Sequence, residues 1–483
     1  MSGDVFAAAR QRIQQEMASL GIPSMAVAVA RQGEVLWEEA WGWADIEKQI
    51  PATPHTPYGM ASVSKPITAT AIMKLVEQGK LDLDRPVNDF LDRDSQLRTW
   101  IGDPAVVTLR RLASHRAGLP LHMHSFASAE ISEKPVMPET IRRYGNVVTV
   151  PGERYRYSNL GYGVLDHLIE RQSGMSYAEF LKQEIFLPLG MTRSSVEDGP
   201  EHDGSMARRY GEDRQPLPWY DVDHRGASSV CCSAHDLLRF GMFHLGQCPG
   251  TPPVLSEHSL TRMHARVTVM GTPNPSDHNL RPGSGYGIGW VIDDDELDSR
   301  ISHGGGMGGV SAKLLMLPRE SLVVVAMANT FCPLPYLIER DILSALLPGY
   351  AEKLAEFDRK RAALPVGASR SERPISELLG DWRGKVHTYQ GDLPFALSFK
   401  PSGDVHARLS EQLPTLVNDL ACVDGWISGK MAGHIETDDV CRRPYHPYHH
   451  VQLDLKLRGD RLTGALIQIM GDSLGHWVEL HRA

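Results

Sequence analysis

Residues 59–78 read GMASVSKPITATAIMKLVEQ, a short turn followed by a run of apolar residues at helical spacing. From Ser62 onward the apolar positions recur every three to four residues, which predicts a helix. Pro66 fits such a helix only near its start, because a residue of the first turn has no intrahelical N–H bond to lose. Gly79 is a typical stop. In this helix Ser62 and Lys65 lie on one face, one turn apart.

The pair Ser62 and Lys65 has a chemical interpretation. A serine that attacks an acyl carbon must lose its proton, so it needs a basic group beside it. The chain contains one Ser-x-x-Lys, and a helix N-terminus favours negative charge on the serine oxygen. A motif this short also occurs by chance, and Ser62 would then be an ordinary N-cap. The four residues alone do not separate these alternatives.

The segments around this helix predict an α+β domain. Residues 21–45 predict two strands joined by a turn at Gln32-Gly33. Further strands are predicted at 286–293, 300–304, 311–317 and 322–327. Helices are predicted at 160–172, 177–186, 234–245 and 335–347. Strands at both ends with helices between them predict one sheet that is assembled from the two ends of the domain and carries an inserted helical lobe.

The C-terminal quarter has a different pattern. Residues 350–377 are charged and then rich in Pro, Gly and Ser, which predicts a linker. Residues 378–483 contain short alternating runs separated by Gly, Asp and Pro, which predict a small antiparallel β-barrel. The predicted domains are therefore 1–349 and 378–483.

A second candidate for a basic group is Tyr157, in the sequence Tyr157-Ser158-Asn159. It lies in a loop that opens directly into the predicted helix 160–172. Tyr144-Gly145-Asn146 has the same spacing but lacks this setting. The alternative for Tyr157 is a packed loop tyrosine without a chemical role.

A third candidate element is His303-Gly304-Gly305-Gly306. Glycines on a strand allow close approach of a ligand and leave N–H groups available to an oxyanion. Gly304, Gly306 and Gly309 also match the spacing of a dinucleotide-binding loop. That interpretation fails, because the next segment predicts a strand where such a loop requires a helix.

Together, Ser62-x-x-Lys65, Tyr157-x-Asn159 and His303-x-Gly305 occur in an order that resembles the class C β-lactamase and penicillin-binding-protein-like serine hydrolases. This family includes esterases, D-aminopeptidases and acyltransferases. Supporting segments are GMASVSKPITA (59–69), TLRRLASHRAGLP (108–120), FLPLGMTRS (186–194) and GYGIGW (285–290). The likeness covers about residues 10–345 and implies a β-lactamase/transpeptidase-like fold, an antiparallel sheet flanked by helices with a helical lobe. Residues 378–483 resemble the lipocalin-like barrel of some members.

The resemblance implies a role for each motif. Ser62 would be the nucleophile that forms the acyl-enzyme, and Lys65 would help to deprotonate the Ser62 hydroxyl. Tyr157 would act as the general base in acylation and as the acid that protonates the leaving group. Asn159 would hydrogen-bond the acyl side of the substrate or Lys65.

The glycine strand would take part in substrate binding. The backbone N–H groups of Ser62 and Gly306 would form the oxyanion hole, and His303, Gly304 and Gly305 would complete this side of the site. β-Lactamases usually have a lysine where this chain has His303, which lowers the expectation of β-lactam hydrolysis. A second departure is Arg225-Gly226-Ala227-Ser228-Ser229, where many relatives have a glycine pair.

The expected reaction is hydrolysis of ester or amide bonds in small molecules or short, possibly D-amino-acid-containing peptides, without metal or organic cofactor. Transfer to an amine, as in an acyltransferase or peptide cyclase, is an alternative. A non-catalytic ligand sensor is another.

Two other readings of the motifs are weaker. Gly471-Asp472-Ser473-Leu474-Gly475 matches the nucleophile elbow of α/β-hydrolases, but only eight residues follow it, too few for the rest of that fold. It reads better as a turn between barrel strands. The histidine-rich stretch 441–450 has no HExxH or paired-cysteine spacing, so a polar loop is favoured over a metal site.

Composition limits the possible partners. The chain of 483 residues is 42% hydrophobic and 23% charged, with a formal net charge of −9, as expected for a globular protein. No basic block suggests a nucleic-acid partner, and no apolar run is long enough to span a membrane. The N-terminus lacks the features of a secretory signal, and the six cysteines show no CxxC spacing. These features favour a cytoplasmic protein without a nucleic-acid or membrane partner; they do not address its oligomeric state.

Overall fold

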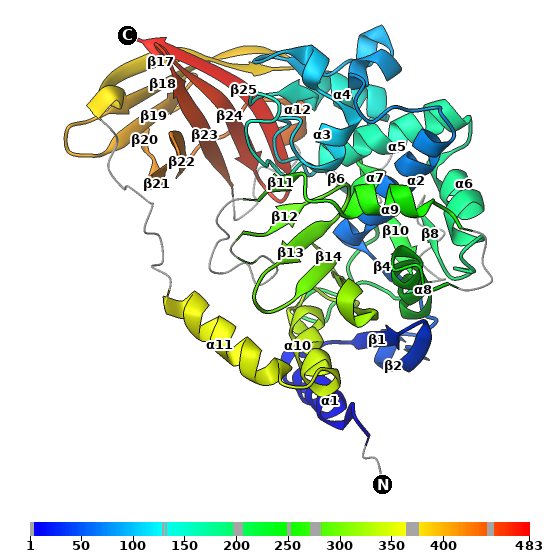
Figure 1. Ribbon diagram of the computed structural model, residues 1–483. Coiled ribbons are helices and arrows are strands. Elements are labelled where there is room, and N and C mark those ends of the chain that lie inside the picture. Colours follow the sequence, from blue (N-terminus) through cyan, green and yellow to red (C-terminus); the bar gives the residue numbers. More distant parts are fainter. Residues whose placement is uncertain are drawn as a thin grey trace. The chain divides into compact units, whose positions relative to one another are not determined.

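The computed structural model describes residues 4–127, 130, 133–196, 206–248, 253–270, 281, 283–363, 376–441 and 449–483 (Figure 1). The chain divides into two compact units. The first unit contains Met1–Leu83, Phe126–Lys134 and Tyr162–Leu364. The second contains Asp84–Ser125, Pro135–Gly161 and Pro365–Ala483, so the C-terminal segment shares its unit with two segments from the N-terminal half.

The first unit is built on a nine-stranded sheet, in the order β11-β12-β13-β14-β15-β16-β1-β2-β3. Its centre joins the two ends of the unit, because β1 pairs antiparallel with β16 in a register that sets Met25 opposite Ala328. Both strands are almost entirely buried, which explains their continuous apolar sequences. The predicted sheet from the two ends of the domain is confirmed. Its strands are β1 (Ser24–Arg31), β2 (Glu34–Asp45), β3 (Ile50–Pro51), β11 (Thr268–Val269), β12 (Gly285–Tyr286), β13 (Val291–Asp294), β14 (Ser299–Met307), β15 (Val310–Leu317) and β16 (Leu322–Ala328).

Helices cover both faces of this sheet. Val324 and Leu315 belong to a core cluster with residues of helices α1 and α10. Their neighbours on the opposite face lie under helix α8, where a Cβ on Gly241 would be 2.5 Å from the side chain of Val323. The helices that lie wholly in this unit are α1 (Ala7–Leu20), α2 (Ser64–Glu77), α6 (Tyr177–Leu181), α7 (Arg225–Ser228), α8 (Ala234–His244), α9 (Glu257–His264), α10 (Leu334–Leu346) and α11 (Tyr350–Ala363). A small second sheet has the order β4 (Tyr58–Gly59), β10 (Val230–Cys232) and β8 (Ser195–Val196).

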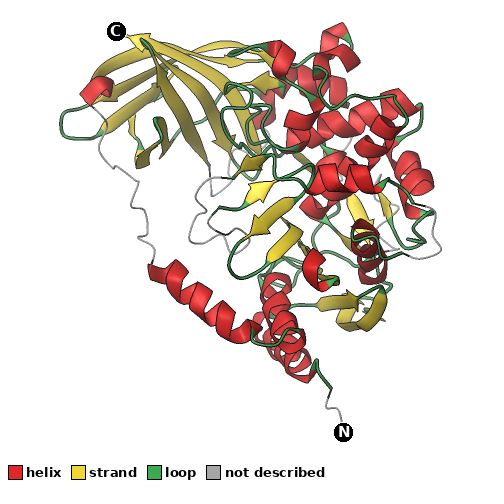
Figure 2. Ribbon diagram, viewed as in Figure 1, coloured by secondary structure: helices red, strands yellow, loops and turns green. Residues whose placement is uncertain are grey.

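The second unit contains a nearly closed, nine-stranded antiparallel barrel (Figure 2). The order β20-β19-β18-β17-β25-β24-β23-β22-β21 is an up-and-down arrangement, in which the first strand, β17, pairs with the last, β25. Alternate residues fill its core, as the period-two sequence pattern predicted. The strands are β17 (Gly380–Thr388), β18 (Gly391–Phe399), β19 (Val405–Leu409), β20 (Thr415–Leu416), β21 (Asn418–Val423), β22 (Trp426–Met431), β23 (His450–Arg458), β24 (Arg461–Ile469) and β25 (Ser473–Arg482).

The N-terminal segments of the second unit pack against the barrel. Two small clusters carry this contact: Leu160 lies with Met470 and Leu474, and Val148 lies with Ala465 and Trp477. The elements in these segments are α3 (Leu109–Ala113), α4 (Met137–Tyr144), β5 (Arg98–Thr99) and β7 (Asn146–Val147). Helix α5 (Asn159–Ser173) begins in the second unit and continues into the first.

Three local predictions differ from the structure. The strand predicted over 286–293 is a hairpin of β12 and β13, because a turn closed by Gly287 N–H on the Trp290 carbonyl (2.8 Å) interrupts it. The helix predicted over 177–186 ends its α-helical part at Leu181 and continues as a π-helical turn, Lys182–Phe186. Of the predicted linker 350–377, Tyr350–Ala363 form helix α11, and residues 364–375 lie outside the described residues. Within the described ranges, every helix is too short or too polar to cross a bilayer.

Candidate active site

Ser62 and Lys65 lie together at the start of helix α2. Ser62 is on a 3-10 turn, Ala61–Val63, that leads directly into the helix. The Lys65 Nζ donates a hydrogen bond to Ser62 Oγ at 3.0 Å. Ala61 has φ +44°, a left-handed conformation that is uncommon for a residue with a Cβ and that often occurs at functional sites. The predicted pairing of Ser62 and Lys65 on one face is therefore present in the structure.

The environment of Lys65 favours its neutral form. Its side chain is fully buried, and burial lowers the pKa of the amine well below its ordinary value. The Nζ also donates to the Ala227 carbonyl at 3.1 Å and lies 5.6 Å from the centroid of the Tyr162 ring. An amine with a lowered pKa is a competent proton acceptor for an adjacent serine hydroxyl near neutral pH.

Helix α7, Arg225–Ser228, is a part of this environment that the sequence reasoning missed. Besides the Ala227 carbonyl, its Gly226 carbonyl accepts a 2.6 Å hydrogen bond from Thr68 on α2. The Gly226 N–H donates to Asp166 at 2.6 Å, and a Cβ at Gly226 would lie 2.5 Å from the Tyr162 carbonyl. Burial raises the pKa of Asp166 to about 7. In the sequence, residues 225–229 stood out only because many relatives have a glycine pair there.

Strand β14 lies against the turn that carries Ser62. A Cβ at Gly305 would be 2.1 Å from the Met60 carbonyl oxygen and 3.1 Å from the Ser62 nitrogen, so a side chain here would displace the turn. Gly304 and Gly306, on the other face of the strand, would meet Tyr336 and Phe331 at 2.7 Å. Close approach was the predicted use of these glycines. The groups that the structure shows approaching them belong to the protein itself.

His303 lies on β14 on the same face as Gly305. Its Nδ1 donates to the Gly304 carbonyl at 2.8 Å, because a carbonyl oxygen can only accept. The Nε2 then accepts a 2.9 Å hydrogen bond from the Tyr286 hydroxyl. Burial is the main cause that lowers the pKa of His303, to about 3. The imidazole is therefore neutral at physiological pH, and Tyr286 is a second residue that the sequence reasoning missed.

Tyr157 and Asn159 belong to the second unit, whereas Ser62, Lys65 and residues 303–306 belong to the first. The surroundings of Tyr157 and Asn159 are therefore given within the second unit. The ring of Tyr157 lies 4.4 Å from the ring of His115, centroid to centroid. The N–H of Ser158 donates to His115 Nδ1 at 3.2 Å. Asn159 is the first residue of helix α5, and its side-chain amide donates a hydrogen bond to the His122 carbonyl at 2.7 Å. The chemical roles predicted for Tyr157 and Asn159 stay predictions.

Two competing motifs have structural roles. Tyr144, in the second Tyr-x-Asn, is fully buried and donates a 2.5 Å hydrogen bond to Asp439. In the Gly-x-Ser-x-Gly at 471–475, the first two residues lie in the predicted turn between β24 and β25 and the last three begin β25, where Ser473 exchanges two backbone hydrogen bonds with Met123. In the histidine-rich stretch, residues 442–448 lie outside the described residues.

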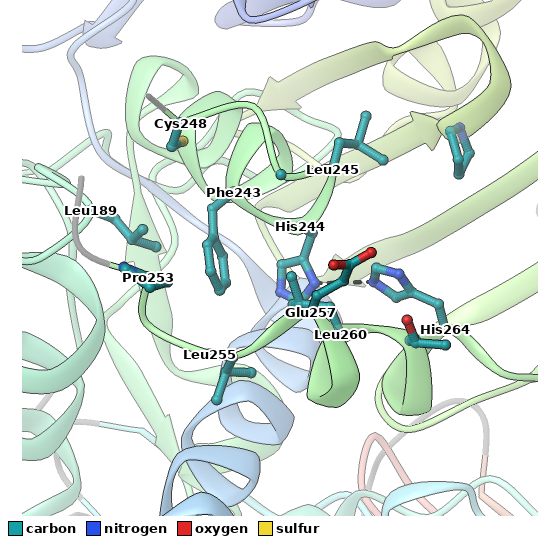
Figure 3. Close-up of a pocket in the computed structure, with 13 residues that line it drawn as sticks. Leu189, Phe243, His244, Leu245, Cys248, Pro253, Leu255, Glu257, Leu260 and His264 are labelled. Carbon is teal, nitrogen blue, oxygen red and sulfur yellow. Dashed lines mark hydrogen bonds between the residues drawn. The ribbon is translucent and has the colours of Figure 1, made fainter. Parts of the chain in front are cut away.

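A pocket of about 570 Å³ lies elsewhere in the first unit, beside helices α8 and α9 (Figure 3). None of its lining residues is one of the predicted site residues. His244 and His264 line it and are joined by a 3.1 Å hydrogen bond, and His244 also bonds Thr70 on helix α2 at 3.1 Å. Burial lowers the pKa of both imidazoles, that of His264 to about 4. The two histidines are therefore uncharged and pack beside helix α2. Their hydrogen-bonded pair does not contain a nucleophile beside a base, as Ser62 and Lys65 do.

A partly buried serine beside a fully buried lysine at the start of helix α2, next to an antiparallel sheet with helices on both faces, is the arrangement typical of the β-lactamase-fold serine hydrolase family. The family model described as Beta-lactamase matches residues 9–347, and the chain belongs to this family.

The chain is similar to several known members. It is 24% identical to Protein flp of Staphylococcus aureus (strain MRSA252) over 325 residues, which is 66% of this chain and 61% of the length of Protein flp. A structure of an octameric penicillin-binding protein homologue from Pyrococcus abyssi aligns with a TM-score of 0.60 and 22% identity, covering 98% of this chain and 99% of that one. EstCE1, described as a hydrolase with promiscuous acyltransferase activity, aligns with a TM-score of 0.59 and 21% identity, covering 70% of this chain and 98% of EstCE1. The structural likenesses establish the fold.

Proposed function

We propose that this protein hydrolyses ester or amide bonds of small molecules or short peptides through an acyl-enzyme on Ser62. The observation that carries the proposal is the 3.0 Å hydrogen bond between Ser62 Oγ and a fully buried lysine amine. A buried lysine with a lowered pKa is costly for the fold, and it has a direct chemical use beside a serine.

The proposed reaction has two acyl-transfer steps. Ser62 Oγ forms a bond to the acyl carbon and gives its proton to the basic group formed by Lys65 and Tyr157. The backbone N–H groups of Ser62 and Gly306 stabilise the oxyanion. The carbonyl then reforms, the bond to the leaving group breaks, and Tyr157 returns the proton to that group. Water repeats the sequence on the ester, releases the acid and restores Ser62.

The uncharged imidazole of His303 favours acyl substrates that carry no carboxylate. A neutral imidazole held by Tyr286 and the Gly304 carbonyl offers no fixed positive charge to a substrate carboxylate. We expect short-chain esters and uncharged amides to be better substrates than a cephalosporin, whose carboxylate would need such a charge.

An amine acceptor is the second candidate. The description of EstCE1 pairs hydrolysis with acyl transfer, so a related chemistry is open to this chain. Adding an amine to an ester assay distinguishes the two: a transferase forms amide product at the expense of acid, and a hydrolase does not. A D-Ala-D-Ala peptide and a D-amino-acid amide belong in the same substrate panel.

A serine-reactive fluorophosphonate probe tests the nucleophile. We expect labelling of the wild type, no labelling of Ser62→Ala, and normal labelling of Ser473→Ala, the matched control from the other serine motif. Labelling that persists in Ser62→Ala would refute the proposal. Labelling of Ser62 without turnover of any substrate in the panel would instead favour a ligand sensor that is acylated once.

A further inference from the structure

The loop that carries Tyr157 is attached to the C-terminal barrel by a set of complementary charges. Strand β23 reads VQLDLKLR over residues 451–458, with apolar residues at alternate positions facing the barrel core. The intervening charged residues, Asp454, Lys456 and Arg458, share the outer face of the strand. The loop preceding Tyr157 carries the same order of charge, an acid followed by two bases: Glu153, then Arg154 and Arg156.

Every one of these charges meets its opposite. Asp454 accepts hydrogen bonds from both Arg154 and Arg156. Glu153 accepts a 2.7 Å hydrogen bond from Lys456 and another from Arg458. Burial alone would raise the pKa of Glu153, but the bonds from Arg458 and Lys456 lower it below its ordinary value. Arg154 also lies over the ring of Trp426 on β22, 3.5 Å from its centroid.

Side chains of this loop alternate in direction. Arg154 and Arg156 contact the barrel strand, whereas Tyr155 and Tyr157 approach the ring of His115, at centroid distances of 5.6 and 4.4 Å. Because Arg154 and Arg156 are the direct chain neighbours of Tyr155 and Tyr157, the contacts of the arginines with the barrel constrain where the tyrosines lie. The side chain of Arg156, directly before Tyr157, is 6% exposed, so it depends on Asp454 for its counter-charge.

The segment on the other side of Tyr157 is attached to the barrel as well. The His115 carbonyl accepts a 2.8 Å hydrogen bond from Arg156 N–H. Further along the same segment, Met123 exchanges backbone hydrogen bonds of 2.8 and 2.7 Å with Ser473 of β25. The Tyr157 loop is therefore held on both sides by elements that contact the barrel.

We propose that the C-terminal barrel is part of the catalytic apparatus, with Asp454 as a positioning residue that holds Tyr157 through Arg154 and Arg156. This inference rests on the proposed function, in which Tyr157 transfers protons. It assigns the barrel a role in the chemical step rather than in stability alone. Since a misplacement of about 1 Å can cost about a hundredfold in rate, loss of this attachment should be visible in kcat.

The test compares Asp454→Asn, which keeps the shape and removes the charge, with Asp460→Asn, an exposed aspartate between β23 and β24. On a short-chain ester we expect Asp454→Asn to lower kcat about tenfold or more with KM within about twofold, and Asp460→Asn to leave both unchanged. Asp454→Glu, which retains the charge, should recover part of the loss. A folded Asp454→Asn enzyme with wild-type kcat would overturn the proposal.

A double variant separates positioning from a general structural effect. If Asp454 acts through Tyr157, then adding Asp454→Asn to Tyr157→Phe should change kcat by less than about twofold, because the tyrosine hydroxyl is already absent. Multiplicative losses would overturn the proposal. If Tyr157→Phe is itself fully active, the proposed function fails at Tyr157; if Tyr157→Phe is impaired and Asp454→Asn is not, only the positioning role fails. Should Asp454→Asn not fold, the same cycle is run with Arg156→Lys, which keeps the charge and loses the planar fork.

Discussion

The turn that carries Ser62 and the loop that carries Tyr157 are held in place in opposite ways. Ser62 and Lys65 are three residues apart, and one turn of helix brings their side chains to a 3.0 Å hydrogen bond. The Tyr157 loop is held by Asp454, Lys456 and Arg458, about 300 residues later in the chain. The first arrangement is local and centred on a fully buried lysine, whereas the second is a long-range set of partly buried ion pairs. Mutations should therefore affect the two regions differently.

The largest expected effect is at Lys65. Lys65→Met should lower kcat/KM by about a hundredfold or more, because the base beside Ser62 is removed. The melting temperature should stay the same or rise, since an apolar side chain of similar length removes the cost of burying an amine. Lys74→Met on the same helix, where the amine binds the Val254 carbonyl, is the control and should keep wild-type activity. A Lys65→Met enzyme that is unstable and still active would contradict this view of the local site.

The two Tyr-x-Asn motifs provide a matched pair for the second region. Tyr157→Phe should lower kcat/KM by about a hundredfold with little change in stability. Tyr144→Phe should keep kcat/KM, but it should reduce the free energy of unfolding by about 1–3 kcal/mol, because the buried Asp439 carboxylate loses a donor. Steady-state kinetics and urea unfolding of both variants measure this contrast. Equal effects of the two substitutions on kcat/KM would remove the distinction between them.

Gly305 tests how tightly β14 holds the Ser62 turn. Gly305→Ala should lower kcat/KM about tenfold or more, because its Cβ would require the Met60 carbonyl and the turn to move. Gly308→Ala is the control, since the nearest atoms to its Cβ are at 3.6 Å, an ordinary contact. Probe-labelling rates report the reactivity of Ser62 in each variant. Similar rates in the two variants would show that the turn adapts without loss of reactivity.

The smallest expected effect is the pH dependence that His303 contributes to stability. Its pKa is lowered to about 3 in the folded protein, whereas the unfolded chain binds the proton near pH 6.5. The stability that depends on the neutral imidazole is therefore complete above pH 6.5 and is lost as the pH falls from 6.5 toward 3. At pH 5 the wild type should lose about 1–2 kcal/mol more than His303→Asn, relative to pH 7.5. Urea unfolding at both values measures it, and parallel losses in the two proteins would mean that His303 titrates normally.

Sequence reasoning was most successful where the determinant was periodic or local. Alternating apolar runs over residues 378–483 predicted a small antiparallel barrel, and the structure shows antiparallel strands with alternately buried residues, such as Val405–Leu409. It was wrong over 286–293, because Gly289 has φ +85° and closes a turn inside an apolar stretch. The role of Ala227 had no signal in sequence, since any residue can offer a backbone carbonyl and only folding brings this one to Lys65.

The sequence by itself determined the α+β class, the barrel and the pairing of Ser62 with Lys65, because these depend on periodicity and on a spacing of three residues within one helix. Only the tertiary structure decided that Lys65 is buried against Ala227, that His303 is held neutral by Tyr286, and that Asp454 anchors the Tyr157 loop. The physical reason is that burial, and with it the protonation state of a side chain, depends on atoms contributed by segments far away in the chain. A spacing pattern carries no information about such distant neighbours.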